Sequence, residues 1–123
     1  MMNTDLWTYR EGVWGTGTTG TTALTGYKIE ARDGSIGRID EATNETGRSC
    51  LVVDTGPWIF GRKVMIPAGT IERVDHDGRK VFVSLTKDQI KDSPEFDDAL
   101  MNDDEYRARL GDYYIRTGWT RAA

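Results

Sequence analysis

The chain has a single histidine, His76, which stands between two carboxylates in the run Asp75-His76-Asp77. Imidazole and carboxylate groups could together hold a metal ion or relay a proton. Gly78 follows directly, so residues 75–78 also match a polar hairpin turn. Three adjacent turn residues rarely converge on one ion. We therefore predict a solvated turn here and no metal site.

Two further patterns could support chemistry. Asp40 and Glu41 form an acidic pair, but neighbouring strand residues point to opposite faces, whereas acid–base catalysis needs two groups in one cleft. The glycines of residues 12–20 resemble a phosphate-binding loop. We expect neither the preceding strand nor the following helix of such a loop, and its Gly-Lys-Ser/Thr ending is missing. The sequence therefore indicates no catalytic and no cofactor-binding residue, and we expect a protein that is not an enzyme.

Cys50 is the single cysteine of the 123 residues, so it cannot form an internal disulfide, which fits a reducing cytoplasm. It opens the apolar run 50–53 and is expected to be a small core residue and not a reactive thiol. No run reaches the roughly 18 apolar residues of a membrane span, and residues 1–9 lack the pattern of a secretory signal. We expect a cytoplasmic protein without a membrane span.

The formal net charge of -4 argues against nucleic acid as a partner, because Lys and Arg supply most of the affinity of such binders. Four basic residues nevertheless lie in two predicted turns that could be neighbours, and two aromatic residues, Trp58 and Phe60, are close in sequence. This alternative nucleic-acid patch consists of Arg62, Lys63, Arg79 and Lys80. RNA or ribosome association is therefore kept as the alternative function.

Composition divides the chain into three zones. Residues 1–22 form an arm rich in glycine and threonine, which carries a high ordering entropy and is expected to be flexible. Its aromatic residues Trp7, Tyr9 and Trp14 either dock on a surface or stay exposed. Residues 23–97 alternate short apolar runs with turns, and residues 98–123 are acidic and rich in tyrosine.

The middle zone has the pattern of an all-β domain. Alternating apolar residues in 27–31, the turn Asp33-Gly34 and a second strand at 35–42 predict a hairpin. Gly37 between Ile36 and Ile39 indicates a bulge or a sharp bend. The run 50–53 suits a strand buried on both faces. Further strands are expected at 58–60, 64–66, 71–74 and 81–85, with 58–60 and 64–66 forming a hairpin.

Helical signals follow the last strand. Thr86 and Gln89 match a capping box, and Ser93-Pro94 ends that short helix. Asn102 is expected to be the N-cap of a second helix, with acids in its first turn and Gly111 as its C-cap. Turn signals about every ten residues in the middle zone suggest a small barrel or sandwich, and the tail beyond Gly111 could cover a barrel edge or clasp a partner subunit.

Residues 23–97 contain the segments LTGY at 24–27, DGSIGRID at 33–40, VDTGPWIF at 53–60, IP at 66–67, IERV at 71–74, VFVSLTKDQI at 81–90 and SPEF at 93–96. In this order and spacing they resemble a PRC-barrel domain, and VDTGPWIF resembles the stand-alone bacterial version. The resemblance implies a small six-stranded, SH3-like barrel, with a short helix after the last strand and a partly helical C-terminal extension.

PRC-barrel domains include the cytoplasmic domain of the photosynthetic reaction-centre H subunit, the C-terminal domain of the ribosome maturation factor, and archaeal proteins tied to cell division. Their shared role is to bind or brace another protein, and no common catalytic residue exists. The resemblance therefore implies a protein-binding or assembly module. An accessory domain of an electron-transfer complex is a further alternative, although the chain shows no means of holding a cofactor.

A domain of this size buries a limited core and has strand edges that need cover, so association with a second copy is expected. We predict a homodimer with a further, unidentified protein partner. The predicted contact surface is aromatic, because aromatic residues contribute strongly to binding energy at interfaces. It comprises Trp58, Ile59, Phe60, Tyr113 and Tyr114.

Overall fold

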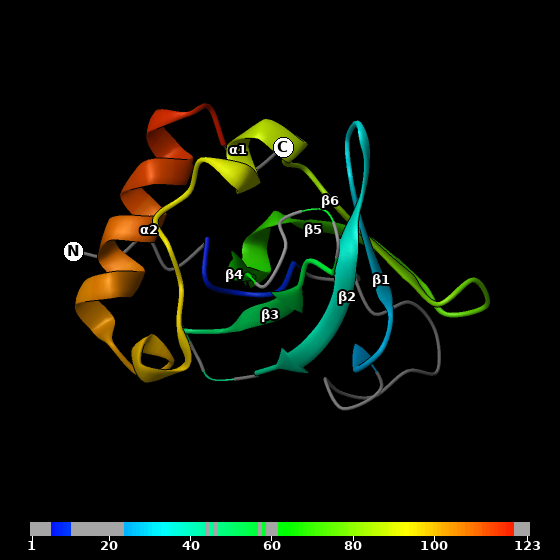
Figure 1. Ribbon diagram of the computed structural model, residues 1–123, viewed down its shortest axis with the longest axis horizontal. Helices are drawn as coiled ribbons and strands as arrows, with labels where there is room; N and C mark the ends of the chain where they lie inside the picture. The colour runs from blue at the N-terminus through cyan, green and yellow to red at the C-terminus, as the bar shows by residue number, and fades with distance from the viewer. Residues whose placement is uncertain are drawn as a thin grey trace.

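The computed structural model describes residues 6–10, 24–43, 45, 47–56, 58 and 62–119. Six strands form one sheet in the order β4-β3-β2-β1-β6-β5 (Figure 1). The neighbours are antiparallel, except that β1 and β6 run parallel. The strands are β1 (Lys28–Ala31), β2 (Gly34–Ala42), β3 (Cys50–Asp54), β4 (Lys63–Pro67), β5 (Ile71–Asp75) and β6 (Lys80–Val83).

The predicted hairpin of β1 and β2 is present, and its bend lies where the sequence indicated. Gly37 has a φ of 150°, and the backbone carbonyl oxygen of Asp54 lies 2.1 Å from the position that a Cβ atom on residue 37 would occupy. Only glycine allows this approach between β2 and β3. The register also shifts on both sides of the bend, between Ile29 and Glu30 and between Ile39 and Glu41.

Strand β3 is buried on both faces, as its apolar run predicted. Cys50 is fully buried, and burial raises the pKa of its thiol, which agrees with a core position. Its Sγ atom lies 3.7 Å from Thr43 Oγ1 and 3.7 Å from Arg107 Nη2. The thiol is therefore enclosed by the fold.

The sheet curves without a hydrogen-bonded closure between its two edge strands. β4 and β5 stand at opposite ends of the strand order, yet they follow each other in the chain through the short 3-10 helix η2 (Ala68–Thr70). A strand pair at 58–60 and 64–66 was expected, but Trp58 lies in a turn and β4 pairs with β3. Residues 59–60 lie outside the described residues.

The capping box at Thr86 is present and starts α1 (Lys87–Lys91). The second helix differs from the prediction: α2 (Asp104–Arg116) has Asp103 and not Asn102 as its N-cap, and it continues through Gly111. Gly111 is needed for packing and not for ending the helix, because Trp7 Nε1 lies 3.3 Å from the position of an added Cβ. Gly118, with a φ of 113°, follows the end of the helix.

Part of the predicted arm belongs to the core. Leu6 and Trp7 are fully buried, and their carbonyl oxygens accept hydrogen bonds from Gly69 N at 2.7 Å and Ser49 N at 2.9 Å. The aromatic residues of the arm were expected either to dock on a surface or to stay exposed. Trp7 docks, because its indole fills the space beside Gly111. Residues 11–23, with Trp14 and most of the glycine-rich run, lie outside the described residues.

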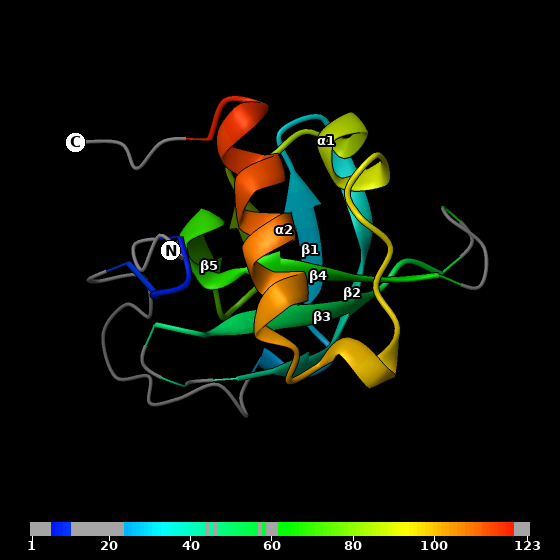
Figure 2. The same cartoon turned by 90° about the vertical axis from the view of Figure 1, so that its left-hand side faces the viewer.

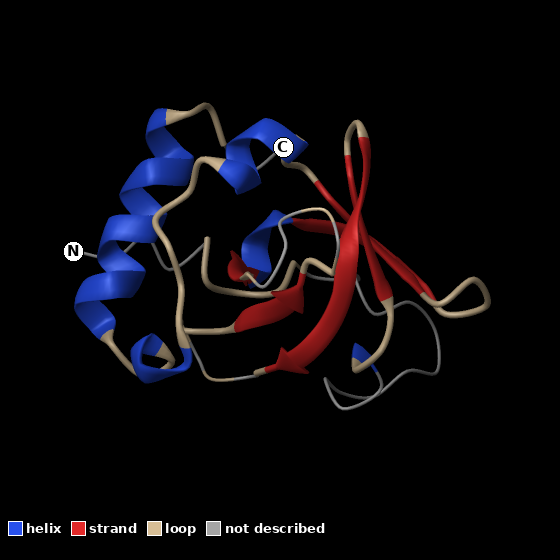
Figure 3. Ribbon diagram, in the orientation of Figure 1, coloured by secondary structure: helices blue, strands red, loops and turns tan. Residues whose placement is uncertain are grey.

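The helices gather on one side of the molecule. Figure 2 shows α2 lying across β3 and β4, and the view of Figure 3 places the β1–β2 and β5–β6 hairpins on the side away from α2. The outer face of β1, β2 and β6 is therefore not covered by α2. No helix in the described ranges is long and apolar enough to cross a membrane.

Candidate nucleic-acid interface

Three cations occupy neighbouring strands at directly paired positions on this outer face. Lys28 of β1 pairs with Lys80 of β6 on one side and with Arg38 of β2 on the other. Paired residues project from the same face with Cβ atoms about 5 Å apart. Lys28 and Arg38 are exposed and Lys80 is half-buried. We call these three residues the cationic row.

At each end of the cationic row, the next residue in the strand register is an aspartate that already accepts a hydrogen bond from a backbone amide. Asp54 pairs with Arg38 and Asp75 with Lys80 in the strand register. Asp54 Oδ1 accepts a hydrogen bond from Gly56 N at 2.9 Å, and Asp75 Oδ1 accepts one from Gly78 N at 3.0 Å. Within the described part of the chain, no ion pair includes a cation of the row.

A cation–aromatic cluster lies next to the row in the chain, where exposed Arg79 covers the buried Tyr27. Arg79 has a φ of 55°, and its guanidinium carbon lies 5.1 Å from the centroid of the Tyr27 ring. Tyr27 Oη lies 3.0 Å from Nδ1 of His76, which follows β5 in the predicted polar turn. His76 therefore helps to fix Tyr27, and no cluster of three metal-ligating side chains occurs among the described residues.

A second row lies two residues further along β1 and β6, and three residues away on β2, where the register shifts. Phe82 pairs with Glu30, which pairs with Ser35, and the guanidinium carbon of Arg73 lies 4.1 Å from the centroid of the Phe82 ring. Two residues along a strand span about 6.7 Å. An aromatic ring and a carboxylate therefore stand directly beside the cationic row.

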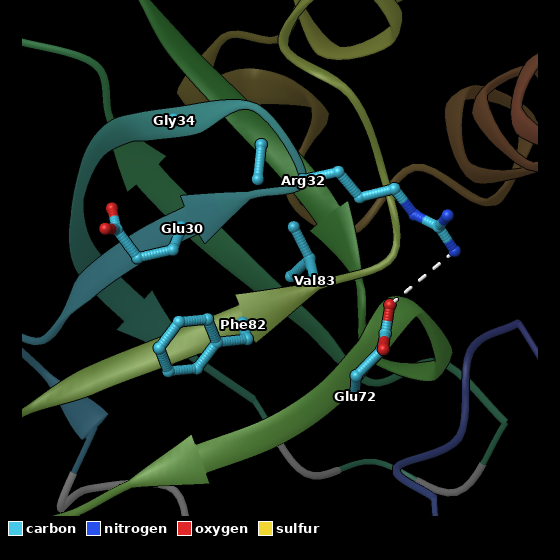
Figure 4. A pocket seen from close by; sticks show the side chains of 7 residues that line it. Glu30, Arg32, Gly34, Glu72, Phe82 and Val83 are labelled. Atoms are coloured by element: carbon cyan, nitrogen blue, oxygen red, sulfur yellow. Dashed lines mark ion pairs between the residues drawn. The ribbon is translucent and has the colours of Figure 1, made fainter.

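A pocket of about 410 Å³ opens beside this second row (Figure 4). Glu30 and Phe82 border one side of it, and Arg32 and Glu72 border the other, joined by an ion pair of 3.7 Å. Gly34 also lines the pocket. Glu30 Oε2 is buried without a hydrogen-bond partner. The pocket thus offers a planar apolar surface, an unused acceptor and a guanidinium.

The four basic residues of the predicted patch do not form one cluster. β3, β2 and β1 separate β4, which carries Lys63, from β6, which carries Lys80. Arg62 donates hydrogen bonds to the carbonyl oxygens of Lys91 and Ser93 at 3.0 and 2.9 Å, so it holds the end of α1. Lys63 forms an ion pair of 3.0 Å with Asp40, and this hydrogen-bonded carboxylate raises the pKa of Lys63.

Lys28 and Arg38 are the site residues that the sequence analysis missed. Lys28 stands at a polar position of the alternating run 27–31, and Arg38 lies beside the predicted bend at Gly37. The signal that joins them to Lys80 is the parallel register of β1 and β6, whose paired residues are about 50 positions apart in the chain. Local alternation carries no information on that register.

The predicted aromatic contact surface is largely engaged within the chain. Tyr114 is fully buried, and Tyr113 is half-buried and donates a hydrogen bond to the Gln89 carbonyl oxygen at 2.6 Å. Trp58 is half-buried, with Lys87 Nζ 5.1 Å from a ring centroid. Ile59 and Phe60 lie outside the described residues. Within the described ranges, Ile115 is the single exposed large hydrophobic residue.

Comparison with known proteins gives limited likeness. No model of a known protein family matches the chain. A stretch of 53 residues is 47% identical to part of an uncharacterized protein from Deinococcus radiodurans, which covers 42% of this chain and 19% of that protein. The match therefore spans about a fifth of the relative's length.

Among solved structures, a protein described as the 16S ribosomal RNA processing protein RimM, from Pseudomonas aeruginosa, superposes with a TM-score of 0.49 and 18% sequence identity. The superposition covers 60% of this chain and 48% of that protein. Likeness at this level assigns neither a family nor a function to this chain.

Proposed function

We propose that this chain is a non-enzymatic module that binds single-stranded RNA across the outer face of β1, β2 and β6. The observation that carries the proposal is the cationic row of Lys28, Arg38 and Lys80. Like charges at directly paired positions destabilise a sheet, so the row is costly unless an anion neutralises it. A phosphate backbone supplies a line of such anions.

The neighbouring aromatic and polar groups favour a single strand over a duplex. Single strands expose the faces and edges of their bases, which stack on aromatic rings and accept or donate hydrogen bonds. Phe82, stacked by Arg73, and the pocket beside Glu30 lie next to the cationic row. Phosphates on the row would therefore leave the bases next to these groups.

The cationic row keeps a positive local charge despite the negative net charge of the chain, because its three cations outnumber the two acids, Asp54 and Asp75, that lie in register with them. Five acids gather at η3 (Asp98–Leu100) and at the start of α2, on the side of the molecule away from β1 and β6 (Figure 1). They are Asp97, Asp98, Asp103, Asp104 and Glu105. A local field is set by the nearest charges, since salt screens exposed charges beyond about 10 Å.

The test measures the affinity of a short fluorescein-labelled single-stranded RNA by fluorescence anisotropy at several salt concentrations. Three phosphate contacts predict a slope of log K against log salt of about -2. Lys28→Gln should lower the affinity and reduce the slope by about 0.7. Lys91→Gln, which changes the net charge equally but lies on α1, is the matched control and should have little effect. No binding by the natural chain, or equal losses in both variants, would contradict the proposal.

We also propose that the sheet is a barrel of the PRC type. The strand order supports this proposal, because β4 and β5 stand at its two ends and the short helix η2 joins them directly in the chain. An experimental structure tests the proposal: β4 and β5 should lie side by side next to η2, and edge strands that lie far apart would instead indicate an open sheet.

The protein-binding hypothesis stays a prediction, as do the homodimer and the accessory role in electron transfer. Tyr114 has no exposed surface to contribute, so an aromatic interface would depend on Trp58, Ile59 and Phe60. Light scattering at micromolar concentration checks the dimer. The double variant Trp58→Ala and Phe60→Ala should then abolish association without unfolding the sheet.

A further inference from the structure

We infer that the pocket bordered by Glu30, Arg32, Glu72 and Phe82 holds one guanine base of the bound strand. This inference rests on the proposed function, because the cationic row would deliver the strand to the pocket. It adds a base preference that phosphate contacts cannot supply, since phosphates are the same in every sequence.

The carboxylate of Glu30 determines which hydrogen-bond donors a ligand of this pocket needs. Glu30 Oε2 is buried without a partner, and a buried polar atom that lacks a hydrogen bond is costly. A carboxylate accepts hydrogen bonds through two oxygens and donates none. A ligand that uses both oxygens of this carboxylate presents two parallel N–H groups on one edge.

Guanine is the base that meets this requirement. Its N1–H and its N2 amino group lie side by side, so they can both donate to one carboxylate. Adenine and cytosine place a lone pair beside their amino group, and uracil places its single N–H between two carbonyl oxygens. Adenine and uracil would therefore direct an acceptor toward the oxygens of Glu30, and cytosine, which has C5–H on the other side of its amino group, could donate only one hydrogen bond.

The other walls suit a planar base. Phe82 is half-buried beside Glu30, and the pocket of about 410 Å³ lies within the range of small-ligand sites. The Arg32–Glu72 ion pair is long, at 3.7 Å, and its side chains are 63% and 44% exposed, so it separates at little cost. The Arg32 guanidinium is then free to stack on the base, as arginine does in RNA complexes.

The experiment compares uridine-rich oligonucleotides that differ at one central position, which is guanosine, inosine, adenosine or uridine. Anisotropy is measured with the natural chain and with Glu30→Gln, whose folding is checked by thermal melting. The guanosine strand should bind the natural chain about tenfold more tightly than the adenosine and uridine strands. Inosine, which keeps N1–H but lacks the amino group, should fall between them.

Glu30→Gln should abolish this preference, and because it removes a carboxylate beside the cationic row, it should bind the uridine strand at least as tightly as the natural chain does. Ser35→Ala, on the same row but outside the pocket lining, should keep the preference. Equal binding of all four strands by the natural chain would overturn the guanine inference and leave the proposed function intact. No binding of any strand would overturn both.

Discussion

Lys28 and Lys80 occupy paired positions on the parallel strands β1 and β6, so two positive side chains project side by side from one face of the sheet. Arg38 extends the same line on β2. Interactions between cross-strand neighbours contribute roughly 0.2–1 kcal/mol, and like charges are unfavourable. The arrangement therefore lowers stability in the absence of an anion.

Lys28→Gln should accordingly raise the free energy of unfolding by about 0.5 kcal/mol in low salt, because it removes the central charge of the row. Urea unfolding measures the change. The gain should vanish near 1 M salt, where the Debye length is about 3 Å. Lys91→Gln is again the control and should show no comparable gain. If Lys28→Gln is instead less stable in low salt, then interactions within the folded protein already offset the charge repulsion at Lys28.

Gly37 is expected to be the glycine of the sheet that tolerates substitution least. Gly37→Ala would place a Cβ 2.1 Å from the Asp54 carbonyl oxygen, so β2 and β3 must separate. We expect a loss of about 3 kcal/mol or more in urea unfolding. Gly56→Ala is the control, since Gly56 also has a positive φ, of 56°, but has open space around its Cβ position. It should cost about 1 kcal/mol, and equal losses would contradict the role of the close contact.

The sequence predicted those features that local patterns determine. The alternation around Ile29, the bend at Gly37 and the capping box at Thr86 all depend on residues within a few positions of one another. Such interactions form between neighbours in the chain, so the types and spacing of residues define them.

Features that depend on distant segments could not be predicted. The parallel pairing of β1 with β6 joins Lys28 to Lys80, and nothing near either residue defines that register. Gly111 matched a helix C-cap, yet the chain uses its missing side chain to admit Trp7, which comes from the opposite end of the sequence. The candidate site was therefore predicted only at Arg79 and Lys80.

Arg107 is a buried cation whose replacement by an apolar residue should be tolerated. It is 1% exposed, its Nε has no hydrogen-bond partner, and its other contacts are the Met101 carbonyl oxygen, Cys50 Sγ and the Trp7 ring. Removing a charge from water costs several kcal/mol, so Arg107→Met, which roughly keeps the volume, should be neutral or stabilising.

Arg107→Ala provides the contrast, because it also leaves a cavity beside Trp7 and should cost about 3 kcal/mol. Thermal and urea unfolding of both variants make the comparison. A large loss in Arg107→Met as well would show that the hydrogen bond to Met101, which precedes the N-cap of α2, outweighs the cost of burying the charge.

Buried tyrosines should make the protein unstable at alkaline pH. Burial raises the pKa of Tyr106 and of Tyr114, whereas both groups ionise near pH 10 in an unfolded chain. Below about pH 10 both states keep these protons, so the stabilising effect of the raised pKa values is complete. Above it the unfolded state alone releases them, and each tyrosine lowers stability by about 1.4 kcal/mol per pH unit.

Tyr106→Phe separates this effect from ordinary packing. At pH 8 it should cost about 1 kcal/mol, since the hydroxyl donates a hydrogen bond to the Pro94 carbonyl oxygen at 2.8 Å. Between about pH 10 and 11 its unfolding free energy should fall by about 1 kcal/mol less than that of the natural chain. Ile90→Val, with a similar expected cost and no titrating group, should keep the natural slope. Equal slopes in all three proteins would mean that the Tyr106 hydroxyl ionises in the folded chain as readily as in water.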